Sequence, residues 1–364
     1  MGEKKVLIID FFNLIKRYTY GGSLADLDEA ELINRITVNI LNKINSVVLE
    51  VNADIVYVCS DSGVNKRALS VNGDYKANRK RAKSLTDVEK EKSYIEYLKR
   101  IVEILPFKFI DVPNTEADLI IQCLVTYIDN LTDSGVDIIV ASSDSDMLQM
   151  LRKNVRIHDW GKGSITVSNW YEKHFKSKFN FNVRNYALAK SIVGDKSDGI
   201  QGLKGVGWKK IEKLFAIISK FYTEDLEITN VLHLTEILKN ILDNFSSDLE
   251  TKELKFLTAI KEQIVNENET IKNNQSLIDL SMYETPHVYK IMSTIIRKTF
   301  QEDVEFNSKY LIKMLKLDKN ILYTPEEYIK IVAKLNKASM MFFYLMKKTK
   351  NVVEYFKQMK TVNL

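Results

Sequence analysis

Cysteine and proline are scarce in this chain, and long apolar runs are missing altogether. The two cysteines in 364 residues, Cys59 and Cys123, lie within apolar patterns typical of a core, so a disulfide framework is excluded. The four prolines leave few marks of linkers between domains. No apolar stretch approaches the ~18 residues that span a bilayer, and the first residues lack a signal-peptide pattern. We therefore expect a cytoplasmic protein, in the host cytoplasm if it is viral, with no membrane partner.

Charge is nearly balanced, with 53 lysines and arginines against 48 aspartates and glutamates, a net charge of +5 and an isoelectric point near 8.8. Such a mild excess is weak evidence for a nucleic-acid partner. The distribution is more informative than the sum. Cations concentrate between residues 66 and 83, whereas carboxylates recur at the ends of apolar runs.

Short apolar runs predict a parallel sheet in the first half of the chain. Residues 6–9, 55–59 and 138–141 are rich in β-branched side chains and do not alternate, which is typical of strands buried on both faces, and residues 107–112 are a weaker fourth candidate. Helical periods separate these runs, so the pattern predicts a doubly wound α/β sheet. From about residue 184 onward, helical patterns dominate.

Carboxylates follow the predicted strands and begin the predicted helices at five places. Each place alone has an ordinary explanation, because acids commonly end strands and occupy helix N-termini. Together they would converge at one edge of the sheet, where like charges repel unless cations neutralise them. The residues are Asp10, Asp61, Glu116, Asp118, Asp144, Asp146, Asp195 and Asp198.

Carboxylate oxygens without a histidine or cysteine cluster favour Mg²⁺ or Mn²⁺ over zinc. Two such ions, about 3.5 to 4 Å apart, would activate water and stabilise the attacking and leaving oxygens of a phosphodiester. The carboxylates therefore predict phosphodiester hydrolysis.

A basic stretch over residues 62–84 has little periodicity and predicts a long loop. A solvated charged loop is the usual meaning of such a stretch. Beside an acidic metal site, however, Lys76 and Arg79 become candidates to hold the scissile phosphate. The neighbouring candidates for DNA contact are Tyr75, Lys80, Arg81 and Lys83.

A glycine-rich turn lies between residues 194 and 210. Its glycines, Gly202, Gly205 and Gly207, permit a tight turn that exposes backbone N–H groups. Lys209 and Lys210 follow in the first helical turn, where cations are unfavourable unless an external anion binds. The turn therefore predicts contact with a DNA phosphate.

These motifs, in this order over roughly residues 5–220, resemble the 5′-nuclease family. That family comprises phage 5′-3′ exonucleases and ribonucleases H, the 5′-nuclease domain of bacterial DNA polymerase I, and flap endonucleases. The resemblance implies a PIN-like α/β catalytic domain, with a central parallel sheet and flanking helices, over residues 1–183, and a basic arch around 62–105. It further implies a helix-three-turn-helix DNA-binding region over 184–265. A helical C-terminal region of unknown role would occupy 266–364.

The resemblance also implies how the site works. The eight carboxylates would hold two Mg²⁺ or Mn²⁺ ions, and the helix-three-turn-helix turn would bind K⁺. The expected activity is a Mg²⁺-dependent 5′-3′ exonuclease or flap endonuclease, or a ribonuclease H, acting in replication or repair on a 5′ flap, a nicked duplex or an RNA–DNA hybrid. Phage members cooperate with single-strand-binding proteins and sliding clamps. Leu119 stands where many members carry a further acid, which leaves one metal ligand in question.

Two other interpretations stay open. A PIN-type ribonuclease would share the sheet and the acids but has no need of the glycine-rich turn. A non-catalytic branched-DNA-binding protein would keep the fold alone, for which Leu119 is slight support. Cleavage assays on flap, nick and RNA substrates distinguish the three.

Overall fold

The computed structural model of the protein describes residues 4–19, 29–62, 68, 71, 73, 95–99, 102, 107–132, 135–176, 181–223 and 225–283. Several predicted sites lie outside the described residues. They are Tyr75, Lys76, Arg79, Lys80, Arg81, Lys83 and the C-terminal residues 284–364.

A six-stranded sheet forms the centre of the first domain, in the order β3-β2-β1-β4-β5-β6. All strands are parallel except β6, which is antiparallel to β5. The predicted parallel α/β sheet is therefore confirmed. Its strands are β1 (Lys4–Asp10), β2 (Ile55–Ser60), β3 (Lys108–Asp111), β4 (Val136–Ala141), β5 (Val155–Asp159) and β6 (Gly163–Ile165).

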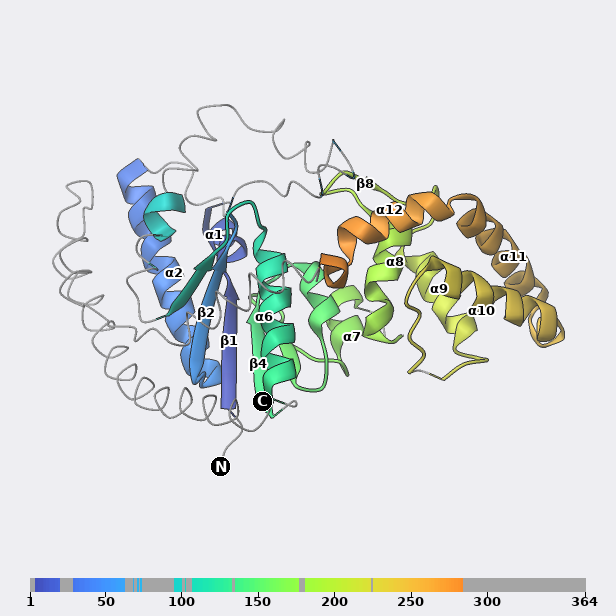
Figure 1. Ribbon diagram of the computed structural model, residues 1–364, viewed down its shortest axis with the longest axis horizontal. Coiled ribbons are helices and arrows are strands. Elements are labelled where there is room, and N and C mark those ends of the chain that lie inside the picture. Colours follow the sequence, from blue (N-terminus) through green and yellow to red (C-terminus); the bar gives the residue numbers. More distant parts are fainter. Residues whose placement is uncertain are drawn as a thin grey trace, which may run out of the picture.

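Helices flank the sheet and then form a separate helical lobe, which lies beside the sheet in Figure 1. The helices near the sheet are α1 (Phe11–Thr19), α2 (Glu29–Val51), α6 (Ala117–Thr132) and α7 (Trp170–Phe175). Those of the lobe are α8 (Tyr186–Val193), α9 (Trp208–Ile218), α10 (Val231–Asn244), α11 (Thr251–Asn266) and α12 (Asn268–Ile278). A hairpin of β7 (Gly194–Asp195) and β8 (Ile200–Gln201) joins α8 to α9. Short 3-10 helices are η1 (Ser145–Met150), η2 (Val183–Asn185), η3 (Ser246–Asp248) and η4 (Leu280–Tyr283).

The central strands are buried on both faces, as their uninterrupted apolar runs predict. Along β1, Val6 and Ile8 pack in the cluster that contains residues of α6, whereas Leu7 and Ile9 pack in the cluster of α1 and α2. The chain adds β2 on one side of β1 and β4 on the other, so the strand order reverses at β1. In open α/β sheets, this reversal is where the strand ends leave a crevice for ligands.

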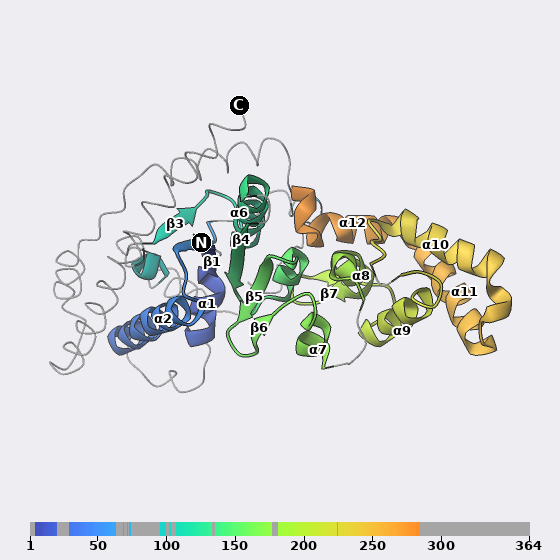
Figure 2. The same ribbon diagram turned by 90° about the horizontal axis from the view of Figure 1, so that it is seen from below.

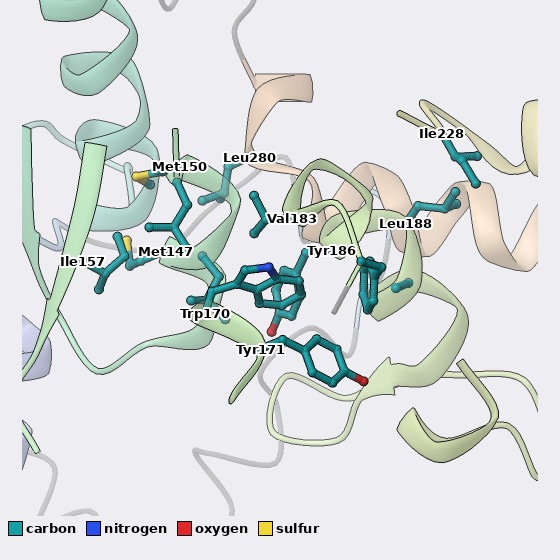
Figure 3. Packing of buried hydrophobic residues seen from close by; sticks show 14 of the residues in the cluster. Met147, Met150, Ile157, Trp170, Tyr171, Val183, Tyr186, Leu188, Ile228 and Leu280 are labelled. Carbon is teal, nitrogen blue, oxygen red and sulfur yellow. The ribbon is translucent and has the colours of Figure 1, made fainter. Parts of the chain in front are cut away.

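An apolar cluster joins the sheet to the helical lobe. Figure 3 shows Met147 and Ile157 on the sheet side and Leu188 on the lobe side, with Trp170 between them. Aromatic stacking continues into α9, because Tyr186 lies on Trp208 with ring centroids 5.6 Å apart. A packed connection of this kind holds the two parts in a fixed relation.

Helix α12 returns from the lobe to the sheet domain, as Figure 2 shows. The Asn274 amide donates to the carbonyls of Ser191 and Gln201, at 2.9 and 2.8 Å. At the C-terminal end of α12, the side-chain amide of Gln149 in η1 donates to the Ile278 carbonyl and accepts from the Leu280 N–H. Hydrogen bonds therefore anchor α12 to both parts of the molecule. None of the helices among the described residues is long and apolar enough to cross a membrane.

Candidate active site

Asp10 ends β1 directly before α1 begins, at the reversal of strand order. Its Oδ1 accepts the Asn13 backbone N–H at 3.0 Å, and its Oδ2 accepts the Ser142 hydroxyl at 2.8 Å. The residue is only 4 % exposed. Burial, together with the negative charges of Asp61 and Asp144, raises the pKa of Asp10 to about 7. The fold thus holds a carboxylate where its charge is costly, as is typical of functional sites.

The loop after β4 carries Asp144 and Asp146. The Ser142 hydroxyl accepts the Asp144 N–H at 3.0 Å, so one serine orients both Asp10 and this loop. Asp144 then caps η1, since its Oδ1 accepts the Asp146 N–H at 2.9 Å. Burial is the main cause that raises the pKa of Asp146 to about 6, and Asp144 adds to it.

Asp61 follows β2 and contacts the start of α6. Its Oδ1 accepts the Ala117 N–H at 2.6 Å, and the backbones of Ser62 and Thr115 pair through hydrogen bonds of 3.0 and 3.1 Å. Ala117 lies between Glu116 and Asp118, so these contacts bring three of the predicted acids to one edge of the sheet. The carboxyl ends of parallel strands meet at that edge.

Asp195 and Asp198 belong to the β7-β8 hairpin and its turn. Asp195 Oδ1 accepts the N–H and the hydroxyl of Ser197, at 2.8 and 2.6 Å. The Asp198 N–H donates to the Asp195 carbonyl at 3.3 Å, and Asp198 is 7 % exposed. The turn therefore fixes both acids relative to each other.

Lys190 of α8 is a site residue that the sequence analysis missed. Its Nζ lies 2.5 Å from Asp146 Oδ1 and 2.7 Å from Asp195 Oδ2, and the residue is 6 % exposed. Although burial opposes the shift, Asp146 and Asp195 raise the pKa of Lys190, and this lysine lowers the pKa of Asp195 to about 2 against the effect of burial. Lys190 and Asp195 are therefore charged at neutral pH. A lone lysine among the apolar residues of 186–193 was the signal available in the sequence.

An acidic cleft brings the later carboxylates together. Its apolar lining includes Leu119, and Leu277 and Ile278 close one wall from α12. Five predicted acids line it: Glu116, Asp118, Asp146, Asp195 and Asp198. Charge interactions connect Asp10 with Asp61 and Asp144, and Asp146 with Asp144 and Asp195. Five of the eight predicted acids therefore share one cleft. The other three, Asp10, Asp61 and Asp144, are close enough to interact with one another or with Asp146.

The carboxylates do not form a ready ligand set by themselves. Within the described part of the chain, no group of three or more histidine, cysteine, aspartate or glutamate side chains forms a set that could hold a metal ion. Lys190 lies against Asp146 and Asp195, and Asp61 accepts a backbone N–H. The arrangement therefore supplies negative charge and oxygen donors, while the ligand assignment of the eight acids stays a prediction.

The glycine-rich turn precedes α9. Gly205 has a φ of +71°, and Gly207 begins the helix without a side-chain cap. The first turn of α9 has no acid, and Lys209 and Lys210 are exposed there. These features favour an anion at the helix N-terminus. DNA contact by these residues stays a prediction.

Gly202 has a second reason to be glycine. A Cβ at this position would lie 1.9 Å from the Val193 carbonyl oxygen and 2.6 Å from the Gly194 N. The hairpin and the end of α8 therefore approach each other more closely than any other residue would permit. The predicted DNA contact of Gly202 is not tested by this packing.

Comparisons of sequence support the family resemblance. The family described as "5′-3′ exonuclease, N-terminal resolvase-like domain" matches residues 5–180. DNA polymerase I of Caldicellulosiruptor bescii is 30% identical over 216 residues, which are 58% of this chain and 24% of that protein. The 5′-3′ exonuclease of Mycoplasma genitalium is 30% identical over 173 residues, which are 47% of this chain and 56% of that protein. The chain thus spans between a quarter and just over half of these relatives.

Comparison with solved structures identifies the same fold. A complex of the bacteriophage T5 flap endonuclease with DNA and metal ions is 21% identical, with a TM-score of 0.57, and the match covers 82% of this chain and 100% of that one. The T5 5′-exonuclease with bound zinc is 22% identical, with a TM-score of 0.56, and the match covers 81% and 100%. The predicted fold is therefore confirmed. The matched domain and the order of its motifs therefore make residues 5–180 similar to the 5′-nuclease family, and the solved structures show the same fold.

Proposed function

We propose that this protein is a structure-specific 5′-nuclease, a 5′-3′ exonuclease or flap endonuclease that hydrolyses phosphodiesters at 5′ ends or flaps in DNA replication or repair. The observation that carries the proposal is the gathering of buried and half-buried carboxylates where the strand order reverses, centred on the buried Asp10 and the half-buried Asp146. The names of the relatives, 5′-3′ exonuclease and flap endonuclease, support it.

The donor chemistry fits two Mg²⁺ or Mn²⁺ ions. The raised pKa values of Asp10 and Asp146 mark sites where negative charge is held without enough compensation, and hard cations with oxygen ligands would supply it. When bound, the ions would act as Lewis acids and lower the pKa of water. The residues proposed to hold them are Asp10, Asp61, Glu116, Asp118, Asp144, Asp146, Asp195 and Asp198. K⁺ is the proposed occupant of the turn before α9.

The chain's own residues would orient the site. Asn13 and Ser142 fix the rotamer of Asp10 through the two hydrogen bonds on its carboxylate. Lys190 supplies a positive charge between Asp146 and Asp195, and it would keep these two carboxylates near each other before substrate arrives. Lys76 and Arg79 are proposed to hold the scissile phosphate as charge develops on it.

Binding of duplex DNA would use a different part of the molecule. Gly202, Gly205, Gly207, Lys209 and Lys210 at the turn before α9 are the proposed phosphate contacts, because the uncapped helix N-terminus offers backbone N–H donors. Tyr75, Lys80, Arg81 and Lys83 are proposed to contact the 5′ single strand. Single-strand-binding proteins and sliding clamps are the proposed protein partners.

A substrate panel tests the function. The purified protein is incubated with a labelled 5′ flap, a nicked duplex, an RNA–DNA hybrid and single-stranded RNA, each with Mg²⁺, with Mn²⁺ and with EDTA. We expect metal-dependent release of products from the 5′ end of the branched and nicked substrates. Cleavage confined to single-stranded RNA would instead identify a PIN-type ribonuclease, and binding of flaps without cleavage in either metal a non-catalytic protein.

A further inference from the structure

Lys99 is a second buried lysine near the acidic edge of the sheet, and the proposed mechanism does not use it. Lys99 is 8 % exposed. Its Nζ donates to the backbone carbonyl of Asp61 at 2.9 Å and to Asp111 Oδ2 at 2.8 Å. Glu96 is farther away, at 3.8 Å, and its side chain is 65% exposed. The ammonium therefore has two strong partners, of which one is the main chain of a proposed metal ligand.

The surroundings of Lys99 hold its backbone in place. Residues 95–99 are helical, and the neighbouring Leu98 is buried in the same apolar cluster as Val47 of α2. Asp111 ends β3, where it pairs in register with Ser60 of β2. Lys99 thus reaches from a packed helix to the ends of two adjacent strands.

The hydrogen bond between Lys99 and Asp61 connects two residues that are distant in the sequence. Asp61 and Lys99 are 38 residues apart, and the residues between them include the predicted phosphate-binding Lys76 and Arg79. The hydrogen bond therefore joins residues on the two sides of the basic stretch 62–84, at a proposed metal ligand. Whereas Lys99 contacts the Asp61 carbonyl, the Asp61 carboxylate accepts the Ala117 N–H at 2.6 Å.

We propose that Lys99 is a positioning residue for Asp61: by holding the Asp61 carbonyl, it fixes the backbone from which that carboxylate reaches a divalent ion. The inference rests on the proposed function, because it takes Asp61 as a metal ligand. Groups that orient metal ligands typically change metal affinity by 10- to 100-fold when they are removed. Lys99 acts through Asp61 and does not itself contact metal or substrate.

Lys99→Met tests this role because methionine retains much of the apolar stem and removes the donor. Mn²⁺ binding is measured by titration calorimetry without DNA, and single-turnover cleavage of a 5′ flap is followed over a series of Mg²⁺ concentrations. We expect the affinity for Mn²⁺ to fall by roughly tenfold, and the Mg²⁺ concentration for half-maximal rate to rise in parallel. DNA affinity in EDTA should stay as in the wild type, since no DNA contact is assigned to Lys99.

Two matched variants separate positioning from general packing. Asp111→Asn leaves the Asp61 contact in place, so its Mn²⁺ affinity should stay near that of the wild type. Lys99→Arg keeps a cationic donor and should recover part of the loss. If Lys99→Met fails to fold, Lys99→Leu is taken through the same measurements, because leucine also removes the donor and keeps an apolar side chain.

A double-mutant cycle with Asp61→Asn gives the decisive comparison. If Lys99 acts through the Asp61 carboxylate, its replacement should change Mn²⁺ affinity little in the Asp61→Asn background. An equal loss in both backgrounds, or wild-type affinity in Lys99→Met, would overturn the proposal. A wild-type protein that neither binds Mn²⁺ nor cleaves DNA would instead contradict the proposed nuclease function, so the two failures are distinguishable.

Discussion

Lys190 lies 2.5 Å from Asp146, and the same ammonium lies 2.7 Å from Asp195. Two carboxylates from different parts of the chain thus share one buried cation. In a low-dielectric site, such a cation reduces the repulsion between acids that face the same cleft. Lys190 is therefore a buried positive charge beside two acids of the acidic cleft.

Replacing Lys190 with Met should destabilise the metal-free protein. Removal of one partner from a buried ion pair leaves an uncompensated charge and commonly costs about 3–5 kcal/mol. Mn²⁺ should then stabilise the variant more than the wild type, because the ion replaces the missing positive charge. Thermal unfolding in EDTA and in Mn²⁺ measures both effects. Lys196→Met, at an exposed position of the neighbouring hairpin, is the matched control, and an equal Mn²⁺ effect in all three proteins would contradict the prediction.

The stability of the metal-free protein should depend on pH through Asp10. The pKa of this carboxyl is raised to about 7, so folding favours its protonated form. Its contribution is present at low pH and is lost as the pH rises from about 4 through 7, at about 1.4 kcal/mol per pKa unit. The raised pKa of Asp146 has the same effect on stability, which is lost as the pH rises from about 4 through 6. The depressed pKa of Asp195 acts in the opposite direction, with stability lost as the pH falls below about 4 through 2.

Asp10→Asn should therefore flatten the dependence and stabilise the metal-free protein at pH 8. Urea unfolding in EDTA at pH 4, 6 and 8 compares the variant with the wild type. Parallel curves for the two proteins over this range would show that Asp10 titrates in its ordinary range.

Much of the sheet and of its acidic edge was predictable, because short-range patterns determine both. The run 6–9 has no alternation, which requires burial on both faces, and Asp10 must then lie at a strand end. The strands β5 and β6 were not predicted. Arg156 and His158 interrupt the apolar pattern of β5, and His158 lies against Glu50 of α2, which is far away in the sequence.

The remaining parts of the site depend on contacts between distant residues. Lys190, Asn13 and Lys99 are ordinary polar residues of their helices until the fold brings them to Asp146, Asp10 and Asp61. The wall formed by α12 is a similar case, since Gln149 and Asn274 anchor it through backbone groups that no pattern marks. The positions of the acids after predicted strands made them candidates. No sequence pattern indicated the residues that orient these carboxylates or neutralise their charge.

Gly202 and Gly207 offer a comparison of two glycines in one turn. Gly202→Ala should strongly destabilise the protein, because its Cβ would lie 1.9 Å from the Val193 carbonyl oxygen and the backbone would have to move. Gly207→Ala should cost no more than about 1 kcal/mol, since nothing lies within 4 Å of its Cβ and only the N-cap preference changes. Chemical denaturation of both variants measures the difference. Similar losses of stability would show that the hairpin relaxes around Gly202.

Replacement of Asp144 or Asp146 with Ala should abolish cleavage and leave binding of flap DNA largely intact, because the two carboxylates are proposed to hold metal. Replacement of Asp195 or Asp198 should instead raise the metal concentration that the reaction requires. Single-turnover cleavage over a Mg²⁺ series, with DNA affinity measured in parallel, tests both statements. Turnover like that of the wild type in Asp146→Ala would contradict the proposed metal site.

The last prediction separates binding from chemistry. Lys209 and Lys210 lie exposed in the first turn of α9 and are not among the residues that line the acidic cleft. Replacing both with Ala should weaken duplex binding at all sequences and reduce the slope of log affinity against log salt by about one unit per lost phosphate contact. The rate of cleavage with all substrate bound should stay unchanged. Lys76→Ala should instead slow the cleavage of bound substrate and leave duplex affinity unchanged. That lysine is proposed to act on the charge that develops during the reaction. One salt series that records affinity and single-turnover rate for each variant tests the division, and a Lys209 and Lys210 pair that slows only the chemical step would contradict it.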